Sequence, residues 1–219
     1  EIEGGEVALP LAGIEGALGA YEPLANLTSL QIDPREYGEG FDGVTDNASH
    51  IQSALDDAAI ALADVSGSTG GAQVVLPKAA IGIGSQLVVP DGVWMVGRGS
   101  MASRLTALSS FPEDTAMVRM GAGVDLYDTG MGLRDLMISC EDLPGVGGVY
   151  SNTWQEPAGL ERLRIRAYRG YAVHSEDTGG GRRASHAYIR RCEFYASVNG
   201  LDVDHSIYVN GSGNTHVFD

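Results

Sequence analysis

Asp202, Asp204 and Glu193 are carboxylates of the kind that cleave glycosidic bonds. Asp202 and Asp204 alternate in the segment "LDVDH", so a strand would project both to one side, about 6–7 Å apart. Hydrolysis of a glycosidic bond uses two carboxyl groups roughly 5–9.5 Å apart, which this spacing permits. His174 and His205 add imidazoles that donate or accept a proton near neutral pH. A solvated outward pair of aspartates gives the same spacing and is the commoner case.

A second candidate site is a concentration of basic residues. Eight of the 14 lysines and arginines lie between Arg162 and Arg191, although the net charge of the chain is −15. Guanidinium groups bind carboxylates in two-point geometry, and tyrosine rings stack on sugars, so this face is a candidate glycan-binding surface. Its candidate residues are Arg162, Arg164, Arg166, Arg191, Tyr168 and Tyr195. In the alternative interpretation, the arginines pair with Glu161, Glu193 and other acidic neighbours on adjacent coils or subunits.

Composition and motifs argue against several other functions. The 29 acidic and 14 basic residues give a surface that repels nucleic acid and anionic lipid. No run approaches the roughly 20 apolar residues that span a bilayer. No cysteine–histidine spacing suits structural zinc, and the glycine segments at 97–100 and 177–183 lack the lysine of a phosphate-binding loop. The sequence predicts no metal, no cofactor, no nucleic-acid partner and no membrane insertion.

An internal repeat identifies the elements that must position these residues. Three similar units, "LRDLMIS", "LERLRIR" and "IRRCEFY", begin at Leu133, Leu160 and Ile189, with spacings of 27 and 29 residues. A second element follows each unit in phase, and these elements begin at Gly148, Gly170 and Gly200. Repeats with a period in the twenties build stacked coils, because one coil cannot bury its apolar face alone. The sequence therefore predicts an all-β fold, a single-stranded parallel β-helix (solenoid).

Alignment of the three units assigns side chains to the two faces of the coil wall. The inward columns are Leu136–Leu163–Cys192 and Ile138–Ile165–Phe194. The outward columns are Asp135–Arg162–Arg191, Met137–Arg164–Glu193 and Ser139–Arg166–Tyr195. This alignment makes Cys192 a buried small hydrophobic residue rather than a reactive thiol. Because Cys140 falls in another column, we expect no disulfide between the two cysteines of the chain.

Upstream of the repeat, residues 46–64 are predicted to form a helix. Thr45 or Asp46 supplies its N-cap. Four apolar residues at helical spacing form one stripe, namely Ile51, Leu55, Ala58 and Leu62. The segments 73–77, 85–90 and 92–97 are apolar or β-branched runs bounded by Pro and Gly, which predicts strands. Residues 1–31 are apolar but weakly periodic, so we expect an N-terminal arm or linker before a β-helix domain at 32–219.

Two stretches in this region, "YGEGFDGVTDNASHIQSALDDAA" and "AQVVLPKAAIGIGSQLVVPDGVWMVGRGS", resemble the pectate-lyase-like right-handed β-helix family. The resemblance covers about residues 32–110 and rests on Tyr37-Gly38, Asp42-Gly43-Val44, Thr45-Asp46 and Ile51-Gln52. Phe41 departs from the glycine that is usual before the aspartate. The resemblance implies a right-handed coil whose N-terminal end is closed by the predicted helix.

That family includes bacteriophage tailspike and tail proteins as well as secreted polysaccharide enzymes. The resemblance therefore implies a phage tail-associated protein, virion-bound and extracellular, that contacts bacterial surface polysaccharide. It also implies a homotrimer, with contacts to other tail proteins through residues 1–31. Two alternatives stay open: a secreted polysaccharide lyase, hydrolase or epimerase, and a purely structural tail component. The sequence lacks the catalytic sets of polygalacturonases and true pectate lyases. The last residues show no obvious capping segment, so either another subunit covers this end or, as we expect, the solenoid continues beyond Asp219.

Overall fold

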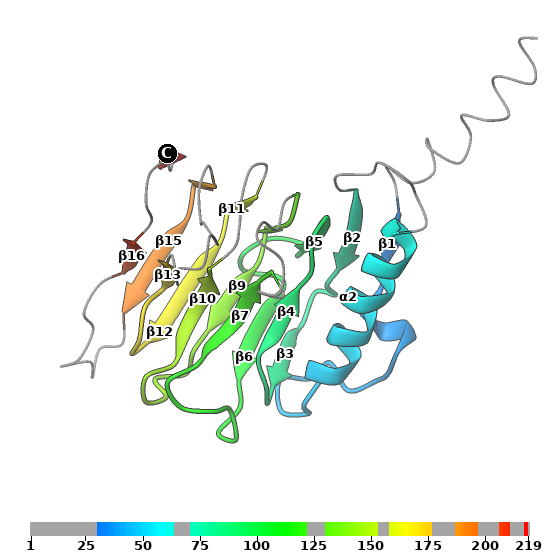
Figure 1. Ribbon diagram of the computed structural model, residues 1–219. Coiled ribbons are helices and arrows are strands. Elements are labelled where there is room, and N and C mark those ends of the chain that lie inside the picture. Colours follow the sequence, from blue (N-terminus) through cyan, green and yellow to red (C-terminus); the bar gives the residue numbers. More distant parts are fainter. Residues whose placement is uncertain are drawn as a thin grey trace, which may run out of the picture.

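The chain winds as a right-handed parallel β-helix with an α-helix packed against its first coils (Figure 1). The computed structural model describes residues 30–63, 71–121, 130–152, 158–176, 187–196, 206–210 and 217–218. In these residues the strands form three parallel sheets, which we call A, B and C, and successive coils stack away from the helix. The predicted fold class, an all-β solenoid with an N-terminal capping helix, is confirmed.

The elements follow a repeating order of one strand from each sheet. Sheet A contains, in spatial order, β1 (Gln31–Ile32), β2 (Ala72–Val75), β5 (Val93–Val96), β8 (Gly132–Arg134), β11 (Gly159–Glu161), β14 (Tyr188–Arg190) and β17 (Val217–Phe218). Sheet B contains β3 (Ala80–Ile83), β6 (Arg104–Ala107), β9 (Met137–Ser139), β12 (Arg164–Tyr168) and β15 (Glu193–Ala196). Sheet C contains β4 (Leu87–Val89), β7 (Ala116–Met120), β10 (Gly147–Ser151), β13 (Val173–Glu176) and β16 (Ile207–Asn210). A short 3-10 helix, η1 (Pro34–Glu36), precedes α2 (Ala48–Ala63).

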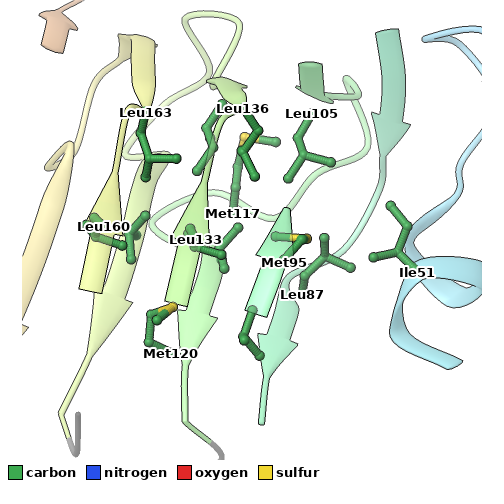
Figure 2. Close-up of a cluster of buried hydrophobic side chains, with 14 of the residues drawn as sticks. Ile51, Leu87, Met95, Leu105, Met117, Met120, Leu133, Leu136, Leu160 and Leu163 are labelled. Atoms are coloured by element: carbon green, nitrogen blue, oxygen red, sulfur yellow. The ribbon is translucent and has the colours of Figure 1, made fainter. Parts of the chain in front are cut away.

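Side chains at equivalent positions of successive coils stack into ladders inside the solenoid (Figure 2). Leu133 of β8 pairs in register with Leu160 of β11, and both are fully buried. In sheet B, Ile138, Ile165 and Phe194 pair in register, as the repeat predicts. Neighbouring strands lie about 4.8 Å apart, so like residues in register fill the interior closely.

In the coils that begin with β8, β11 and β14, one sharp corner joins sheet A to sheet B and brings an outward column together. The three corner residues have left-handed backbone conformations: Asp135 (φ 58°), Arg162 (φ 52°) and Arg191 (φ 53°). A left-handed residue bends the chain sharply at this corner, and the residue that follows turns into the core. Leu136 and Leu163 are buried there, and Cys192 is partly buried against the same core. The predicted inward column is confirmed.

Helix α2 begins two residues later than predicted and ends one residue earlier. Asn47 directly precedes it, and its carbonyl accepts the first helical hydrogen bond, so the N-cap is Asn47 and not Thr45 or Asp46. Asp46 still accepts from the first free N–H group of the helix, as predicted, because its Oδ1 accepts from the backbone N–H of Ala48 at 2.9 Å, and it also accepts from that of Gly84 at 2.8 Å. The aspartate therefore ties the helix start to the turn after β3.

The Ile-Gln pair in the helix closes the first coil in two ways. Ile51 is fully buried and projects toward the interior ladders (Figure 2). Gln52 bonds the backbone of Val88 in β4, since its Nε2 donates to the carbonyl at 3.0 Å and its Oε1 accepts from the N–H at 2.8 Å. Ile51 thus covers apolar surface, and Gln52 provides hydrogen-bond partners for backbone groups at the edge of sheet C.

The positions of the second repeated element are corrected by the observed register. Val149 pairs with Val173, and Val173 pairs with Ile207. The strand that stacks on β13 is therefore β16, and the expected element from Gly200 is not its partner. Alignment on glycines fails because the connections between sheets differ in length from coil to coil. Gln31, placed in the N-terminal arm by sequence, lies in β1, and residues 1–29 are outside the described part of the chain.

Candidate functional site

The outward face of sheet C carries one column of basic and aromatic side chains. Arg119 pairs in register with Tyr150, Tyr150 with His174, and His174 with Tyr208. A groove of about 690 Å³ lies over Arg119, Tyr150 and His174. Its other walls include Gln86, Asp114, Pro144, Gly145, Arg169 and Tyr171. Stacked coils thus place side chains from β7, β10 and β13 on one floor, although they are far apart in sequence.

Three tyrosine rings surround His174. The imidazole centroid lies 4.7 Å from that of Tyr171, 5.0 Å from that of Tyr208 and 5.3 Å from that of Tyr150. The Tyr150 and Tyr208 rings meet the imidazole edge to face, with interplanar angles of 76° and 77°. Such contacts favour one ring orientation. The three tyrosines therefore restrain the imidazole, and two of them, Tyr150 and Tyr171, also line the groove.

Glu176 reaches both the phenol and the imidazole. The Tyr150 hydroxyl donates to Glu176 Oε1 at 3.0 Å, and Glu176 Oε2 lies 3.4 Å from His174 Nε2. The second contact is not aligned as a hydrogen bond, so the buried Nε2 has no hydrogen-bond partner among the described residues. Burial, together with the hydrogen bond and charge of Glu176, raises the pKa of Tyr150 to about 12. The phenol is therefore protonated at neutral pH and acts as a hydrogen-bond donor.

Arg119 supplies positive charge to the same floor. Its guanidinium carbon lies 5.8 Å from the centroid of the Tyr150 ring, and its Nη2 is 3.4 Å from Asn152 Oδ1. Its Nε is buried without a hydrogen-bond partner among the described residues. A second guanidinium, that of Arg169, lines the groove near the connection from β12 to β13. Two arginines beside a tyrosine and a histidine suit a ligand that carries both carboxylates and sugar rings.

Three residues predicted to bind glycan meet on a different face. Arg164, Arg166 and Tyr195 line a pocket of about 380 Å³ on the outside of sheet B, together with Met101 and Asp142. We call it the sheet B pocket. The sequence thus places these three residues together correctly, because their register in sheet B follows the predicted repeat.

Glu193, a predicted catalytic carboxylate, stands beside this pocket in an ion pair with Arg164. The Arg164 guanidinium donates to Glu193 Oε2 from Nε at 2.8 Å and from Nη2 at 2.5 Å. The Tyr195 hydroxyl donates to the same oxygen at 3.0 Å. These hydrogen bonds, first that of Arg164 and then that of Tyr195, lower the pKa of Glu193. The carboxylate is therefore ionised, which suits ion pairing and not donation of a proton.

The two remaining arginines lie at the corner between sheets A and B. Arg162 forms a two-point ion pair with Asp135, with distances of 2.6 and 2.7 Å, and also contacts the carboxylate of Glu161. The alternative interpretation, in which arginines pair with acidic neighbours, therefore holds for Arg162 as it does for Arg164. Arg191 occupies the next position of this column and is exposed.

Tyr168 does not lie on a binding surface, which corrects its assignment as a glycan-binding residue. It is fully buried, and its hydroxyl lies 2.6 Å from the hydroxyl of Ser206. Regular alternation from Arg166 would point it outward, but the register shifts between Arg166 and Tyr168 at a bulge. Ala167 takes a left-handed conformation there, with φ 52°, and turns Tyr168 into the core. No glycine or proline marks this bulge in the sequence.

Comparison with known proteins identifies a fold and no family. No family model matches the chain, and no curated protein sequence matches it. The A-module of mannuronan C-5 epimerase AlgE4 from Azotobacter vinelandii is similar in structure, with a TM-score of 0.63 and 21% identity over 85% of this chain and 55% of that one. ORF18 of Geobacillus virus E2 has a TM-score of 0.51 and 14% identity, over 100% of this chain and 52% of that one. The pre-mature gene product 12 of bacteriophage phi29 has a TM-score of 0.52 and 10% identity, over 82% of this chain and 26% of that one.

These similarities support the parallel β-helix alone, because the identities are low. The chain spans about half the length of the epimerase module and of the Geobacillus virus protein. Among the described residues, no group of three His, Cys, Asp or Glu side chains is placed to hold a metal ion. No helix in the described ranges is long and apolar enough to cross a membrane. Cys140 and Cys192 are free thiols, and burial raises the pKa of each.

Sequence reasoning found His174 but missed the groove around it. Arg119, Tyr150, Tyr171 and Glu176 were not among the predicted site residues. A signal for the shared column exists, because "VYS" at 149–151 and "VHS" at 173–175 align once the valines, and not the glycines, are matched. Asp202, Asp204 and His205 lie outside the described residues, so their predicted roles stay predictions.

Proposed function

We propose that this chain is a polysaccharide-contacting β-helix protein whose binding site is the groove over sheet C. The observation that carries the proposal is the column of Arg119, Tyr150 and His174 on the floor of a groove of about 690 Å³. An extended floor of ring surface beside charged side chains matches a chain of sugars better than a compact small molecule.

The preferred polymer carries carboxylates. Arg119 and Arg169 both line the groove, although the chain as a whole has a net charge of −15. A carboxylate that enters the groove finds guanidinium donors at close range, and charge-assisted hydrogen bonds of this type are the stronger ones. Neutral sugars gain only the stacking contacts with the tyrosines.

The biological setting that we propose is a bacteriophage tail, where the protein contacts surface polysaccharide of the host as a homotrimer of the pectate-lyase-like type. Two proteins from viruses share the coil, ORF18 of Geobacillus virus E2 and gene product 12 of phage phi29. Residues 1–31 would contact other tail proteins. Light scattering after size exclusion tests the oligomer, and a monomer at micromolar concentration would contradict a stable trimer.

The groove is tested by binding measurements with a panel of purified polysaccharides. Alginate and polygalacturonate serve as acidic probes, and dextran serves as a neutral probe. We expect an acidic polymer to bind and dextran to bind weakly or not at all. Arg119→Gln removes a guanidinium from the groove, whereas Arg98→Gln removes one from an exposed position outside the described groove. Binding that both variants retain equally would refute the site.

A second function, proton transfer on the bound polymer, is favoured by one further observation. Glu176 contacts the Tyr150 hydroxyl and lies beside His174 Nε2. One carboxylate therefore positions a phenol, which can donate a proton, and an imidazole, which can accept one. Removal of the proton next to a sugar carboxylate yields an enolate that a guanidinium stabilises. The enolate then either expels the neighbouring glycosidic oxygen, which takes a proton from the Tyr150 hydroxyl, as in a lyase, or takes a proton from water on its opposite face, as in an epimerase.

Product analysis separates binding from chemistry. A lyase gives an unsaturated sugar that absorbs in the ultraviolet, a hydrolase gives reducing ends without that absorbance, and an epimerase changes the sugar ratio at constant length. We expect His174→Gln to abolish either of the proton-transfer activities. Binding without any of these products identifies a recognition protein, and reducing ends alone would instead favour the predicted pair Asp202 and Asp204.

A further inference from the structure

We infer that the sheet B pocket is a second site for the same polysaccharide, which takes a carboxylate-bearing sugar of a chain already held in the sheet C groove. The inference rests on the function proposed above and adds a site to it. Two observations carry it: an unpaired guanidinium beside an exposed ring, and the short distance along the chain between the linings of the two cavities.

The aromatic side of the sheet B pocket is held in place. Tyr195 is 52% exposed, and its hydroxyl is fixed by Glu193 at 3.0 Å. The guanidinium carbon of Arg164 lies 5.5 Å from the centroid of the same ring, and Arg164 is itself bonded twice to Glu193. Little conformational freedom is lost when a sugar stacks on a ring that is already fixed.

The cationic side of the pocket is free to bind. Arg166 is exposed, and its guanidinium has no hydrogen bond or ion pair to any side chain in the part of the chain that the structure describes. Arg164 and Arg162, by contrast, are both committed to carboxylates. In a strongly acidic chain, an unpaired arginine beside a fixed tyrosine is a binding position for an anionic sugar.

The two cavities lie on either side of one ridge, formed by the β9–β10 connection and, on the next coil, by the end of β12 and its connection to β13. On the β9–β10 connection, Asp142 lines the sheet B pocket and Pro144 lines the groove. On the following coil, Ala167 lines the pocket and Arg169 lines the groove. The two residues of each pair are two positions apart in the chain, so their Cα atoms are separated by about 7 Å at most.

Hydrogen bonds between the β9–β10 connection and the end of β12 make this ridge a rigid spacer. The N–H of Asp142 donates to the carbonyl of Ala167 at 2.8 Å, and the N–H of Cys140 donates to that of Arg166 at 3.0 Å. Ala167 and Asp142 both hold left-handed conformations, with φ 52° and 63°. A polymer that leaves the groove over this ridge reaches Arg166 next. Short oligomers occupy only one of the two sites.

The expected consequence is affinity that depends on the length of the glycan. Once a polymer is held in the groove, its next acidic sugar meets Arg166 at high effective concentration. The probe is the acidic polymer that binds best in the panel above, together with its own short oligomers, each measured by calorimetry with the full chain. We expect Arg166→Gln to weaken polymer binding about tenfold, the loss of one charge-assisted bond, and to leave the short oligomers unchanged.

Two matched variants keep this inference separate from the proposed function. Arg98→Gln removes the same charge from an exposed position and is expected to change neither affinity. Arg119→Gln is expected to weaken polymer and oligomer alike, because both use the groove. If Arg166→Gln leaves polymer binding intact, or weakens short oligomers equally, the second site is refuted while the groove stands. If Arg119→Gln affects neither ligand, or no acidic polymer binds at all, the proposed function itself is refuted.

Discussion

The side-chain amide of Gln52 makes two hydrogen bonds with the backbone of Val88, one as donor at 3.0 Å and one as acceptor at 2.8 Å. A neighbouring strand would satisfy the same N–H and carbonyl of β4. One helical side chain therefore stands in for the missing strand at the first edge of sheet C. Such an edge otherwise offers unpaired backbone groups to another chain.

Replacement of Gln52 by leucine should destabilise the fold and promote self-association. Leucine keeps the size of the side chain but leaves the N–H and carbonyl of Val88 without these partners. We expect a loss of roughly 1–3 kcal/mol in the free energy of unfolding. Urea denaturation measures this loss, and light scattering measures association through the uncovered edge.

Ser53→Ala is the matched control, because Ser53 is the next residue of α2 and is exposed. Alanine favours helix slightly, so this variant should be as stable as the parent or more so. Equal stability of the Gln52→Leu variant and the parent would show that the two bonds contribute nothing measurable.

The sequence was informative where one physical rule acted alone. Leu133 and Leu160 stack because an apolar residue recurs at the same position of each coil, and Ile51 is buried because a helix must cover the open end. The outward column of Arg164 and Glu193 followed from the same alignment. Periodic burial is visible in a single chain, since every coil faces the same interior.

The functional groove was less predictable because it depends on register between elements that share little sequence. Tyr150 and His174 meet only because Val149 pairs with Val173, whereas matching Gly148 with Gly170 suggests a different alignment. Tyr168 was misplaced because a bulge at Ala167 breaks the alternation of the strand. Connection length and bulges are set by local packing, which a single sequence does not display.

The corner ion pair should make stability depend on acid pH. The hydrogen bond from Arg162, followed by its charge, lowers the pKa of Asp135. Because the folded pKa is lowered, the stabilisation is present above the unfolded value of about 3.9 and is lost as pH falls through the folded pKa. Asp135→Asn should therefore be about 1 kcal/mol less stable, or less, at pH 7, and the difference should vanish in acid.

Asparagine is the suitable replacement for Asp135, because it tolerates the left-handed conformation at φ 58°. Glu113→Gln provides a control with the same change of charge at an exposed position. High salt should reduce the effect of Asp135→Asn as well, since Arg162 is 39% exposed. A difference between parent and Asp135→Asn that persists unchanged in acid would argue against the ion pair as its cause.

The phenol of Tyr150 should lose its proton at a higher pH than an ordinary tyrosine. Its pKa is raised to about 12 by burial first and by Glu176 second. In Glu176→Gln the charge disappears and the burial stays, so we expect the pKa to fall only part of the way toward its usual value of about 10. Ultraviolet titration of the parent against Tyr150→Phe isolates this one group.

Stability should respond to the same group in alkali. The pKa of Tyr150 is higher in the folded protein than in the unfolded chain, so the phenol adds to the free energy of unfolding. This contribution is complete below the unfolded pKa of about 10 and is lost as pH rises through the folded pKa of about 12. The parent should therefore lose stability more steeply over that range than Tyr150→Phe does. Identical slopes would mean that the phenol ionises as easily in the folded protein as in the unfolded chain.

Gly132 should tolerate no side chain while Trp94 is present. The two residues pair in register on the outside of sheet A, and a Cβ at Gly132 would collide with the indole ring. The guanidinium carbon of Arg134, on the same strand as Gly132, lies 5.8 Å from the centroid of that ring. Gly132→Ala must displace the ring, which we expect to cost about 1–3 kcal/mol even though alanine suits a strand better than glycine.

A double-mutant cycle identifies the collision as the cause. In a Trp94→Leu background the flat ring is gone, so Gly132→Ala should cost less than it does in the parent, and the two changes should be non-additive. Near-ultraviolet circular dichroism of Gly132→Ala should also change, because the indole leaves its position over the sheet. Strict additivity with an unaltered spectrum would place the cost in the backbone of β8, and the contact between Trp94 and Gly132 would then have no energetic role.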